Sequence, residues 1–372
     1  MQVADARAEA LASLKAGYAE LTPGQKLTYR LFRPEDAPGV GRLFWQVYGD
    51  GYPVDDPYIP ELLIEANRTG RIHTVVVVAE DGSIVAQAAC FQSSPPNRRL
   101  YEYGQLLLDK GYRNTFAAAR MHQFFVKNML GQMDGVDGTY GEAVCHHLVT
   151  QKMVIGSGFR ECGAELGLMP ETAYAGEGVV GRASCLFAQR VDQDQPGALY
   201  LPGEWGGLVQ GIMGQWPLSR DVGEGDAQVP AQAVTRLEAR QFPFAGVRRV
   251  TVFRIGADFA ARMAAELEAA RADRATLVQL FLCLGEAWTG AAAQALRQAG
   301  FFFAGFMPQW FGETGAGPDG ILVQRFLEPV TLAGLRFWTP EMEQLGMRIV
   351  ADMERSSREF GAPSVTFLPV PG

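Results

Sequence analysis

Several side chains in the first half of the sequence could move protons. Glu102 and Glu142 lie in apolar segments typical of strands, and His146 and His147 directly follow the second of these. Burial of a carboxyl group among apolar residues raises its pKa, which suits a general base near neutral pH. Histidine titrates in the same range. Glu102, Glu142 and His147 are therefore candidate catalytic residues, and a salt-bridged or structural role stays the alternative for each.

Cys145 precedes the two histidines, and Cys162 is the next cysteine along the chain. Adjacent ligands followed by so long a gap match no common metal-ligand spacing, so we predict no metal site. A nucleophilic Cys145 could carry an acyl group covalently. A cysteine in an apolar strand is more often a packing residue.

A second set of residues could bind an anionic group. The segment Leu106-Leu-Leu-Asp-Lys-Gly-Tyr-Arg113 ends an apolar strand and leads into a helix expected over 114–130. A helix N-terminus presents unpaired N–H groups and the positive end of the helix dipole, which suits a pyrophosphate. The alternative is an ordinary strand-to-helix turn with Arg113 facing solvent.

The loop of residues 48–58 is rich in aromatic and acidic residues. Asp55 and Asp56, together with Asp50, could attract a cationic amine, and Tyr48 and Tyr52 could add cation–π contacts. A solvated surface loop of the same composition is equally consistent with the sequence.

Composition limits the class of protein. The chain has 372 residues, 48% of them hydrophobic, and a net charge of −8. This length suggests about two domains. No basic stripe indicates a nucleic-acid partner, and no apolar stretch is long enough to span a membrane. Scattered cysteines and the absence of an N-terminal apolar core favour a cytoplasmic protein. Oligomeric state is left open.

Periodicity and turn residues predict alternating helices and strands. In the first half we expect helices at 4–20, from Pro34, at 59–69, 114–130 and 147–157, and strands at 28–32, 74–79, 84–91, 100–108, 138–145, 159–168 and 183–190. Residues 191–247, rich in Gly and Pro, are not assigned. Beyond them we expect strands at 250–255, 276–284, 301–307 and 320–327, and helices from Asp258 to 271, at 289–299, and from Thr339 to Gly361.

Two segments look like copies of one unit. Gly141-Glu-Ala143 is followed by Gly158-Phe159 and Met169-Pro170, and Gly285-Glu-Ala287 by Gly300-Phe301 and Met307-Pro308. The shared order of strand, helix, Gly-Phe and strand predicts a duplicated α/β unit. We expect an N-terminal helix in 1–27, repeats at 28–191 and 192–330, and a helical tail at 331–372.

Four stretches of the first half resemble the GNAT superfamily of acyl-coenzyme A-dependent N-acyltransferases. They are Arg30-Leu-Phe-Arg-Pro-Glu-Asp36, the hairpin turn Asp81-Gly82, the segment Leu106–Arg113, and Glu142–Lys152 followed by Gly158-Phe159. The second half resembles a degenerate GNAT-like repeat. The resemblance implies a mixed, mostly antiparallel α/β sheet flanked by helices and duplicated along the chain.

The resemblance also implies roles for individual residues. An acyl-CoA, most simply acetyl-CoA, would be the co-substrate, with no metal, and a small-molecule or peptide amine would be the acceptor. Glu102 or Glu142 would be the base, His147 a candidate acid, and loop 48–58 the acceptor site. The residues that would bind the cofactor are Leu106, Leu107, Leu108, Arg113, Asn114, Thr115, Phe116, Ala117 and Ala118.

Two alternatives stay open. Phe116 stands where the family has a glycine, and the expected helix 147–157 contains no tyrosine to act as the acid. Both departures are consistent with a non-catalytic binding or regulatory protein. The chain could instead use another activated donor, such as an aminoacyl carrier, in a cleft shaped by residues 191–247. The turn Arg254–Asp258 is too short to cradle a pyrophosphate, so the second half is not expected to bind coenzyme A.

Overall fold

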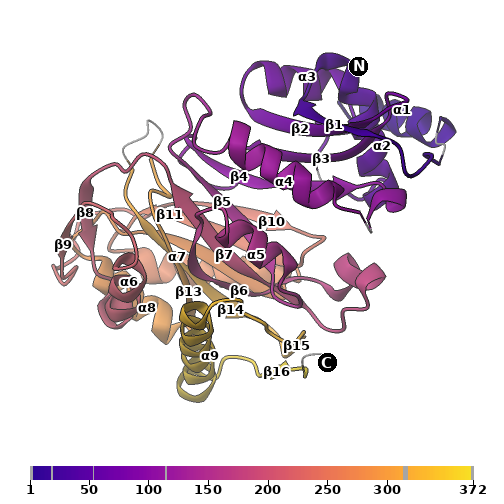
Figure 1. Cartoon of the computed structure of the whole chain (residues 1–372). Helices are drawn as coiled ribbons and strands as arrows, with labels where there is room; N and C mark the ends of the chain where they lie inside the picture. The colour runs from indigo at the N-terminus through magenta and orange to yellow at the C-terminus, as the bar shows by residue number, and fades with distance from the viewer. Residues whose placement is uncertain (1–2, 18–19, 53, 114, 313–316, 370–372) are drawn as a thin grey trace. The chain divides into compact units, whose positions relative to one another are not determined.

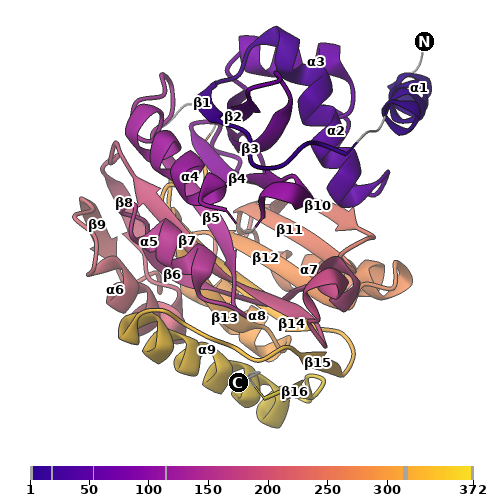
Figure 2. The ribbon, with the colours of Figure 1, turned by 45° about the vertical axis from the view of Figure 1, so that its right-hand side comes forward.

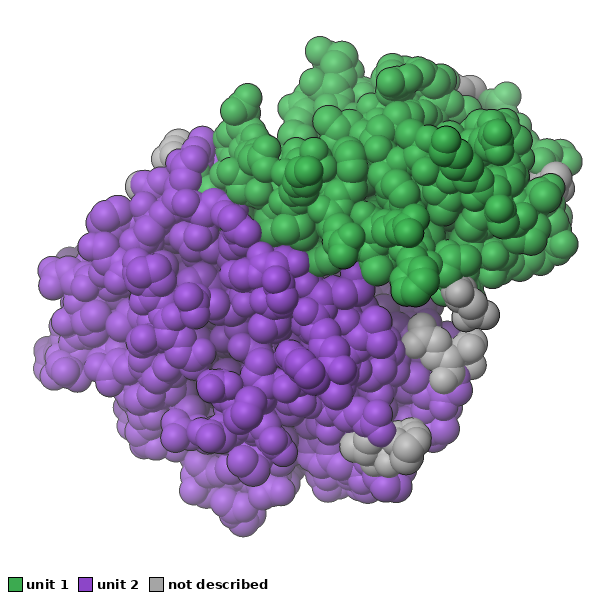
Figure 3. All heavy atoms as spheres, viewed as in Figure 1, with its two compact units in different colours: residues 1–94, 101–139 green, residues 95–100, 140–372 purple. Residues whose placement is uncertain are grey.

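The computed structural model describes residues 3–17, 20–52, 54–113, 115–312 and 317–369. The chain divides into two compact units (Figure 3). Unit 1 comprises residues 1–94 and 101–139, and unit 2 comprises residues 95–100 and 140–372. The boundary that the sequence predicts between the two repeats, at residue 191, lies inside unit 2. The division of the chain into two repeats stays a prediction. Among the described residues, no helix is long and apolar enough to cross a membrane.

Unit 1 has the helices and strands that the sequence predicts, in the same order. They are α1 (Val3–Ala16), β1 (Leu27–Leu31), the 3-10 turn η1 (Pro34–Asp36), α2 (Ala37–Tyr48), α3 (Pro60–Arg68), β2 (Ile72–Ala79), β3 (Ile84–Phe91), β4 (Leu100–Leu108), the 3-10 turn η2 (Lys110–Tyr112) and α4 (Ala117–Asn128) (Figure 1). Each strand of the series β1-β2-β3-β4 is antiparallel to the next. Gly82 in the hairpin turn has φ +89, which glycine adopts without strain.

Apolar faces of the helices cover the strands of unit 1. In α2, Val40, Leu43 and Phe44 are fully buried and pack with residues of α3, β2 and β3 in one core cluster. Helix α4 contacts β1, β2 and β3 and buries Met121 and Phe125 completely. The run of β-branched residues in β2 is buried over most of its length, as expected for a strand covered on both faces.

Unit 2 contains the remaining elements. They are β5 (Gly138–Val144, beginning in unit 1), α5 (Val149–Ile155), β6 (Arg160–Met169), the 3-10 segment η3 (Glu171–Glu177), β7 (Ala183–Val191), β8 (Gly197–Tyr200), η4 (Gly203–Trp205), α6 (Gly206–Met213), β9 (Arg220–Gly223), β10 (Arg236–Phe242), β11 (Val247–Arg254), α7 (Phe259–Ala272), β12 (Leu277–Cys283), α8 (Thr289–Gln298), β13 (Phe302–Met307), β14 (Gly320–Phe326), β15 (Val330–Leu332), α9 (Pro340–Phe360) and β16 (Val365–Phe367) (Figure 2). Residues 191–247, unassigned from the sequence, supply β8, α6, β9 and β10.

The strands of unit 2 form a large, mostly antiparallel sheet in the order β5-β7-β6-β13-β14-β12-β11-β10. Strand β7 lies between β5 and β6, as β14 lies between β12 and β13. The strands β5, β7 and β6 form one set, and β13, β14 and β12 form another. The two sets meet where Gly163 of β6 pairs with Gly305 of β13. A Cβ on Gly163 would lie 2.1 Å from the carbonyl oxygen of Ala304, so only glycine permits this approach. The predicted fold class, mixed α/β with a mostly antiparallel sheet and flanking helices, is confirmed.

The predicted repeats share three sequence motifs, and the structure places two of them, but not the third, at equivalent positions. Gly158 and Gly300 both have positive φ, +86 and +80, and each comes just before the strand that it introduces, β6 or β13. Met169 and Met307 end those two strands. The Gly-Glu-Ala motif differs, because Glu142 lies inside β5 whereas Glu286 follows the end of β12. The Gly-Phe and Met-Pro pairs therefore mark equivalent places, and the Gly-Glu-Ala match does not.

The sequence predicts that helices in the second half begin at Asp258 and Thr339 and that the latter helix ends at Gly361. Thr339 accepts a hydrogen bond from the backbone N–H of Met342 (3.1 Å), and Gly361 ends α9 with φ +65, as predicted. Asp258 stands at the N-cap of α7 but does not cap it. Its carboxylate accepts from the backbone N–H of Thr235 (2.8 Å) and so fixes the preceding segment instead.

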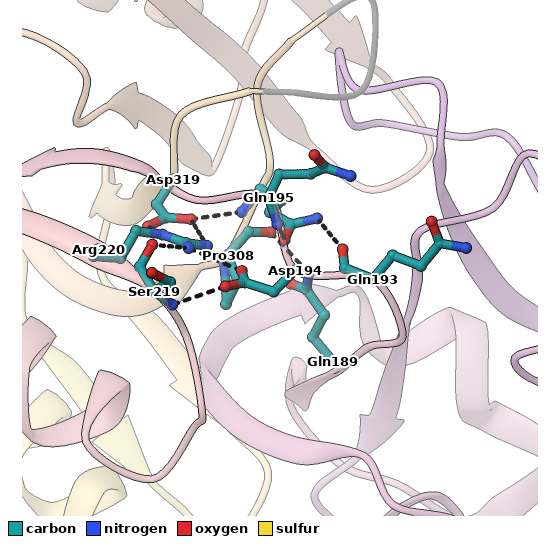
Figure 4. A network of polar contacts seen from close by, with 9 residues as sticks. Gln189, Gln193, Asp194, Gln195, Ser219, Arg220, Pro308 and Asp319 are labelled. Atoms are coloured by element: carbon teal, nitrogen blue, oxygen red, sulfur yellow. Dashed lines mark hydrogen bonds and ion pairs between the residues drawn. The ribbon is translucent and has the colours of Figure 1, made fainter.

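A buried ion-pair network joins the loops of unit 2 (Figure 4). Arg220 donates to both carboxylate oxygens of Asp319, at 2.6 and 3.1 Å, and to Asp194 at 2.8 Å. Asp319 is fully buried and also accepts from the backbone N–H of Gln309 (2.8 Å). Burial raises the pKa of the Asp319 carboxyl, and the hydrogen bonds from Arg220 partly offset that effect. The network is fully partnered, so we assign it a structural role.

Candidate active site

The loop between β4 and α4 is held at its start by Asp109. This residue is 2% exposed, and its Oδ1 accepts from the backbone N–H of Gly111 (2.9 Å). Its Oδ2 accepts from Arg42 Nη1 of α2 (3.2 Å). Tyr112 is also anchored, because its hydroxyl donates to the carbonyl of Thr22 (2.8 Å). The loop thus leaves β4 in a defined direction before Arg113.

The predicted cofactor residues line the turn into α4. Arg113 is exposed, and Asn114 lies outside the described residues. Thr115 Oγ1 donates to the carbonyl of Tyr112 (2.7 Å) and accepts from the backbone N–H of Ala117 (3.2 Å). Phe116 precedes the helix and its side chain is 77% exposed. The ring therefore occupies solvent, and the first turn, with Ala117 and Ala118, keeps its helical geometry.

Strand β4 contains an irregularity that the sequence did not predict. Gln105 has φ +52, and the pairing register shifts so that Gly104 and Leu107 face Ala89 and Gln87. This is a β-bulge, a feature common beside active sites. The side chain of Gln87 donates to the carbonyl of Gln105 (2.6 Å) and holds the bulge in place. Of the predicted pantetheine residues, Leu106 lies in the bulge, and Leu107 and Leu108 resume the ladder.

Tyr52 reaches the bulge from loop 48–58. Its hydroxyl accepts a hydrogen bond from Gln105 Nε2 (3.1 Å), and its ring packs on Phe44 (4.9 Å) and Tyr48 (5.1 Å between centroids). Burial raises the pKa of the Tyr52 hydroxyl, and the negative charge of nearby Glu102 adds to the effect. Glu102 and Tyr52, predicted separately as base and substrate contact, therefore belong to one cluster in unit 1.

Asp55 and Asp56 have partners within the protein. Arg7 of α1 binds Asp55 (2.6 Å) and also donates to the carbonyls of Asp50 and Tyr52. Arg71 binds Asp56 (2.6 Å). Both carboxylates are thus neutralised by arginines of unit 1, and these ion pairs brace the loop that carries Tyr52. Sequence spacing could not reveal the ion pairs, because Arg7 is far from Asp55 along the chain.

The other predicted catalytic residues belong to unit 2. Glu142 lies in β5, and residues 145–148 form a bend rather than strand or helix. The rings of His146 and His147 contact each other edge to face, with 4.9 Å between their centroids. Burial raises the pKa of the Cys145 thiol, which disfavours a nucleophilic thiolate. In the part of the chain that the structure describes, no cluster of three metal ligands occurs.

In unit 2, the pairing of β11 with β10 has a register shift between Arg236 and Leu237, whereas the ladder of β11 with β12 is uninterrupted. Strands β11 and β12 are parallel and pair residue by residue from Val247 with Leu277 to Val252 with Leu282. At the end of β11, Glu286 accepts from the backbone N–H of Ile255 (2.6 Å), and Trp288 donates to the carbonyl of the same residue (3.0 Å). The backbone groups in this region are therefore already engaged by the protein.

Neither a protein-family model nor a curated protein sequence matches the chain. Among solved structures, an N-acetyltransferase from Staphylococcus aureus Mu50 matches with 13% identity and a TM-score of 0.36, over 45% of this chain and 99% of that one. A ribosomal-protein-S5-alanine acetyltransferase from Vibrio fischeri matches with 12% identity and a TM-score of 0.34, over 48% and 98%. YncA from Salmonella typhimurium, solved with its cofactor acetyl-CoA, matches with 12% identity and a TM-score of 0.37, over 45% and 95%.

Proposed function

We propose that this protein is an acyl-CoA-dependent N-acyltransferase whose reacting groups are carried by unit 1. The bulge in β4 carries the proposal. Its residue Gln105 lies three positions after Glu102 in the same strand, it is fixed by Gln87, and it directly precedes an anchored loop and a helix N-terminus. A bulge releases backbone groups from the ladder, and such groups can bind the amides and the carbonyl of a thioester co-substrate.

The residues of the loop suit an anionic co-substrate. Arg113 is exposed and supplies a positive charge, and the first turn of α4 begins at Ala117. Because Phe116 projects into solvent, the backbone of that turn stays open to a phosphate. Acetyl-CoA would supply the thioester carbonyl that an amine attacks. A small-molecule or peptide amine remains the proposed acceptor.

Proton transfer can be assigned to the cluster at the bulge. Glu102 would take the proton that the amine nitrogen loses as it attacks, and Tyr52 O–H would supply the proton that the departing sulfur requires. Gln105 orients the Tyr52 hydroxyl through the 3.1 Å hydrogen bond. Glu142 and His147, which belong to unit 2, stay predictions from the sequence and take no part in this assignment.

Calorimetric titration with acetyl-CoA tests the proposal. We expect binding in the micromolar range for the unmodified chain and at least roughly tenfold weaker binding for Arg113→Glu, because the substitution replaces attraction of the pyrophosphate by repulsion. Arg348→Glu on the exposed face of α9 is the control for net charge and should bind like the parent. A panel of amines with Glu102→Gln then tests catalysis, and we expect kcat to fall by about 10²-fold.

Two departures from the family favour the non-catalytic alternative, Phe116 at the glycine position of the loop and the absence of a tyrosine from the predicted helix 147–157. Absence of binding at millimolar acetyl-CoA would support that alternative or the use of another donor. Binding without turnover of any amine would support a regulatory role. The strand orders β5-β7-β6 and β12-β14-β13 are equivalent. We further propose that they reflect a duplication, in which the second copy has lost the cofactor site.

A further inference from the structure

A groove of about 530 Å³ runs along α9 in unit 2 and takes no part in the proposed reaction. One wall is a stripe of α9, and the other is the segment Leu335–Phe337 with Leu148. The α9 stripe consists of Glu343, Gly346, Met347, Val350, Ala351 and Glu354. The spacing of these residues places them on one helix face. The volume lies within the usual range for ligand sites.

The wall opposite α9 is rigid. Gln151, which is fully buried, donates to the carbonyl of Arg336 (2.9 Å) and accepts from the backbone N–H of Trp338 (3.0 Å). The backbone N–H of Arg336 donates to the carbonyl of Cys145 (2.8 Å). A Cβ on Gly346 would lie 2.4 Å from the Phe337 ring, so the ring packs directly on the helix backbone. The groove is therefore preformed.

The surface of the groove is apolar at its centre and acidic at its ends. Met347 is 61% exposed, an unusual exposure for a large apolar side chain. Glu343 and Glu354 are exposed and lie three helical turns apart, roughly 16 Å at about 1.5 Å per residue. Glu354 pairs with Arg358 at 3.9 Å, a long distance for an ion pair. Among the described residues of the lining, one side chain is basic, Arg336, and two are carboxylates, so the carboxylates are in excess.

We propose that this groove binds an amphipathic helical segment of another protein, apolar at its centre and basic at both ends. Such a segment matches the stripe of α9 in spacing and in charge. A second copy of this chain fits poorly, because antiparallel pairing of two α9 helices would place Glu343 beside Glu354. Two rim carboxylates would then face each other across the interface.

Two synthetic helical peptides test the proposal on the full chain. They share one Leu/Ala face and carry either Lys or Glu at the two ends of that face. Fluorescence anisotropy should show the Lys peptide binding at least about tenfold more tightly than the Glu peptide, with affinity falling as salt rises. Glu343→Lys combined with Glu354→Lys should reverse the preference. Equal binding of both peptides, or no reversal, would overturn the proposal.

Met347→Asp tests the centre of the groove. The substitution should weaken binding of the Lys peptide by at least roughly tenfold, because apolar contacts at the centre of an interface carry most of the affinity. Phe244→Asp, at an exposed apolar residue in the turn between β10 and β11, is the matched control and should leave affinity unchanged. Self-association of the chain that Met347→Asp abolishes would identify a second copy as the occupant and would also overturn the proposal.

Discussion

Gln151 is completely buried and bonds to four backbone groups. Its amide donates to the carbonyls of Val144, His147 and Arg336 and accepts from the N–H of Trp338. Methionine has a similar shape but offers none of these hydrogen bonds, so Gln151→Met should leave several buried polar groups unsatisfied. We expect the free energy of unfolding to fall by about 2–4 kcal/mol. Urea denaturation measures this loss, and Gln344→Met on the exposed face of α9 is the control.

His73 in β2 predicts a pH dependence of stability. Burial lowers the pKa of its imidazole below the ordinary value of 6.5. Below pH 6.5 the unfolded chain therefore binds a proton that the folded chain does not, and the free energy of unfolding decreases as pH falls through this range. His73→Phe should remove that part of the slope between pH 7 and pH 5. Identical slopes for parent and variant in urea denaturation would contradict the assignment.

At the scale of elements, the contact between β6 and β13 depends on glycine. Gly163→Ala places a methyl group against the Ala304 carbonyl, so the strands must separate, and we expect a loss of at least about 2 kcal/mol in stability. Gly207→Ala in α6, where a Cβ meets nothing within 4 Å, should instead stabilise by about 0.5–1 kcal/mol. Thermal denaturation of the two variants distinguishes a steric role of Gly163 from a general effect of removing glycine.

The elements themselves were largely predictable, and several contacts between them were not. The β-branched, apolar runs on both sides of Asp81-Gly82 indicated the β2–β3 hairpin, and Thr339-Pro340 indicated the start of α9. The bulge at Gln105 has no local signal beyond Gly104, because it is stabilised by Gln87 of the neighbouring strand. Likewise the ion pairs of Asp55 and Asp56 are made with residues from other elements, so composition alone suggested free carboxylates.

At the scale of the whole molecule, the two halves should differ in cofactor binding. The loop from Arg254 to Phe259 is short, and the backbone N–H of Ile255 within it already donates to Glu286. We therefore expect a stoichiometry of one acetyl-CoA per chain in the calorimetric titration. Two sites of similar affinity would show that the second half also binds the co-substrate. Replacement of Arg254 by an uncharged residue should leave acetyl-CoA binding in this titration unchanged, in contrast to Arg113→Glu.

The pairing of Gly163 with Gly305 also has a consequence for how the chain is made. Strand β6 leaves the ribosome well before β13, and domains begin to fold as they emerge. Until β13 arrives, β6 has β7 on one side and, on the other, an unpaired edge of residues that are almost all buried in the finished fold. An exposed edge of this kind can pair with another nascent chain. The interval between the two strands is thus the stage of synthesis at which a chaperone would protect this protein most.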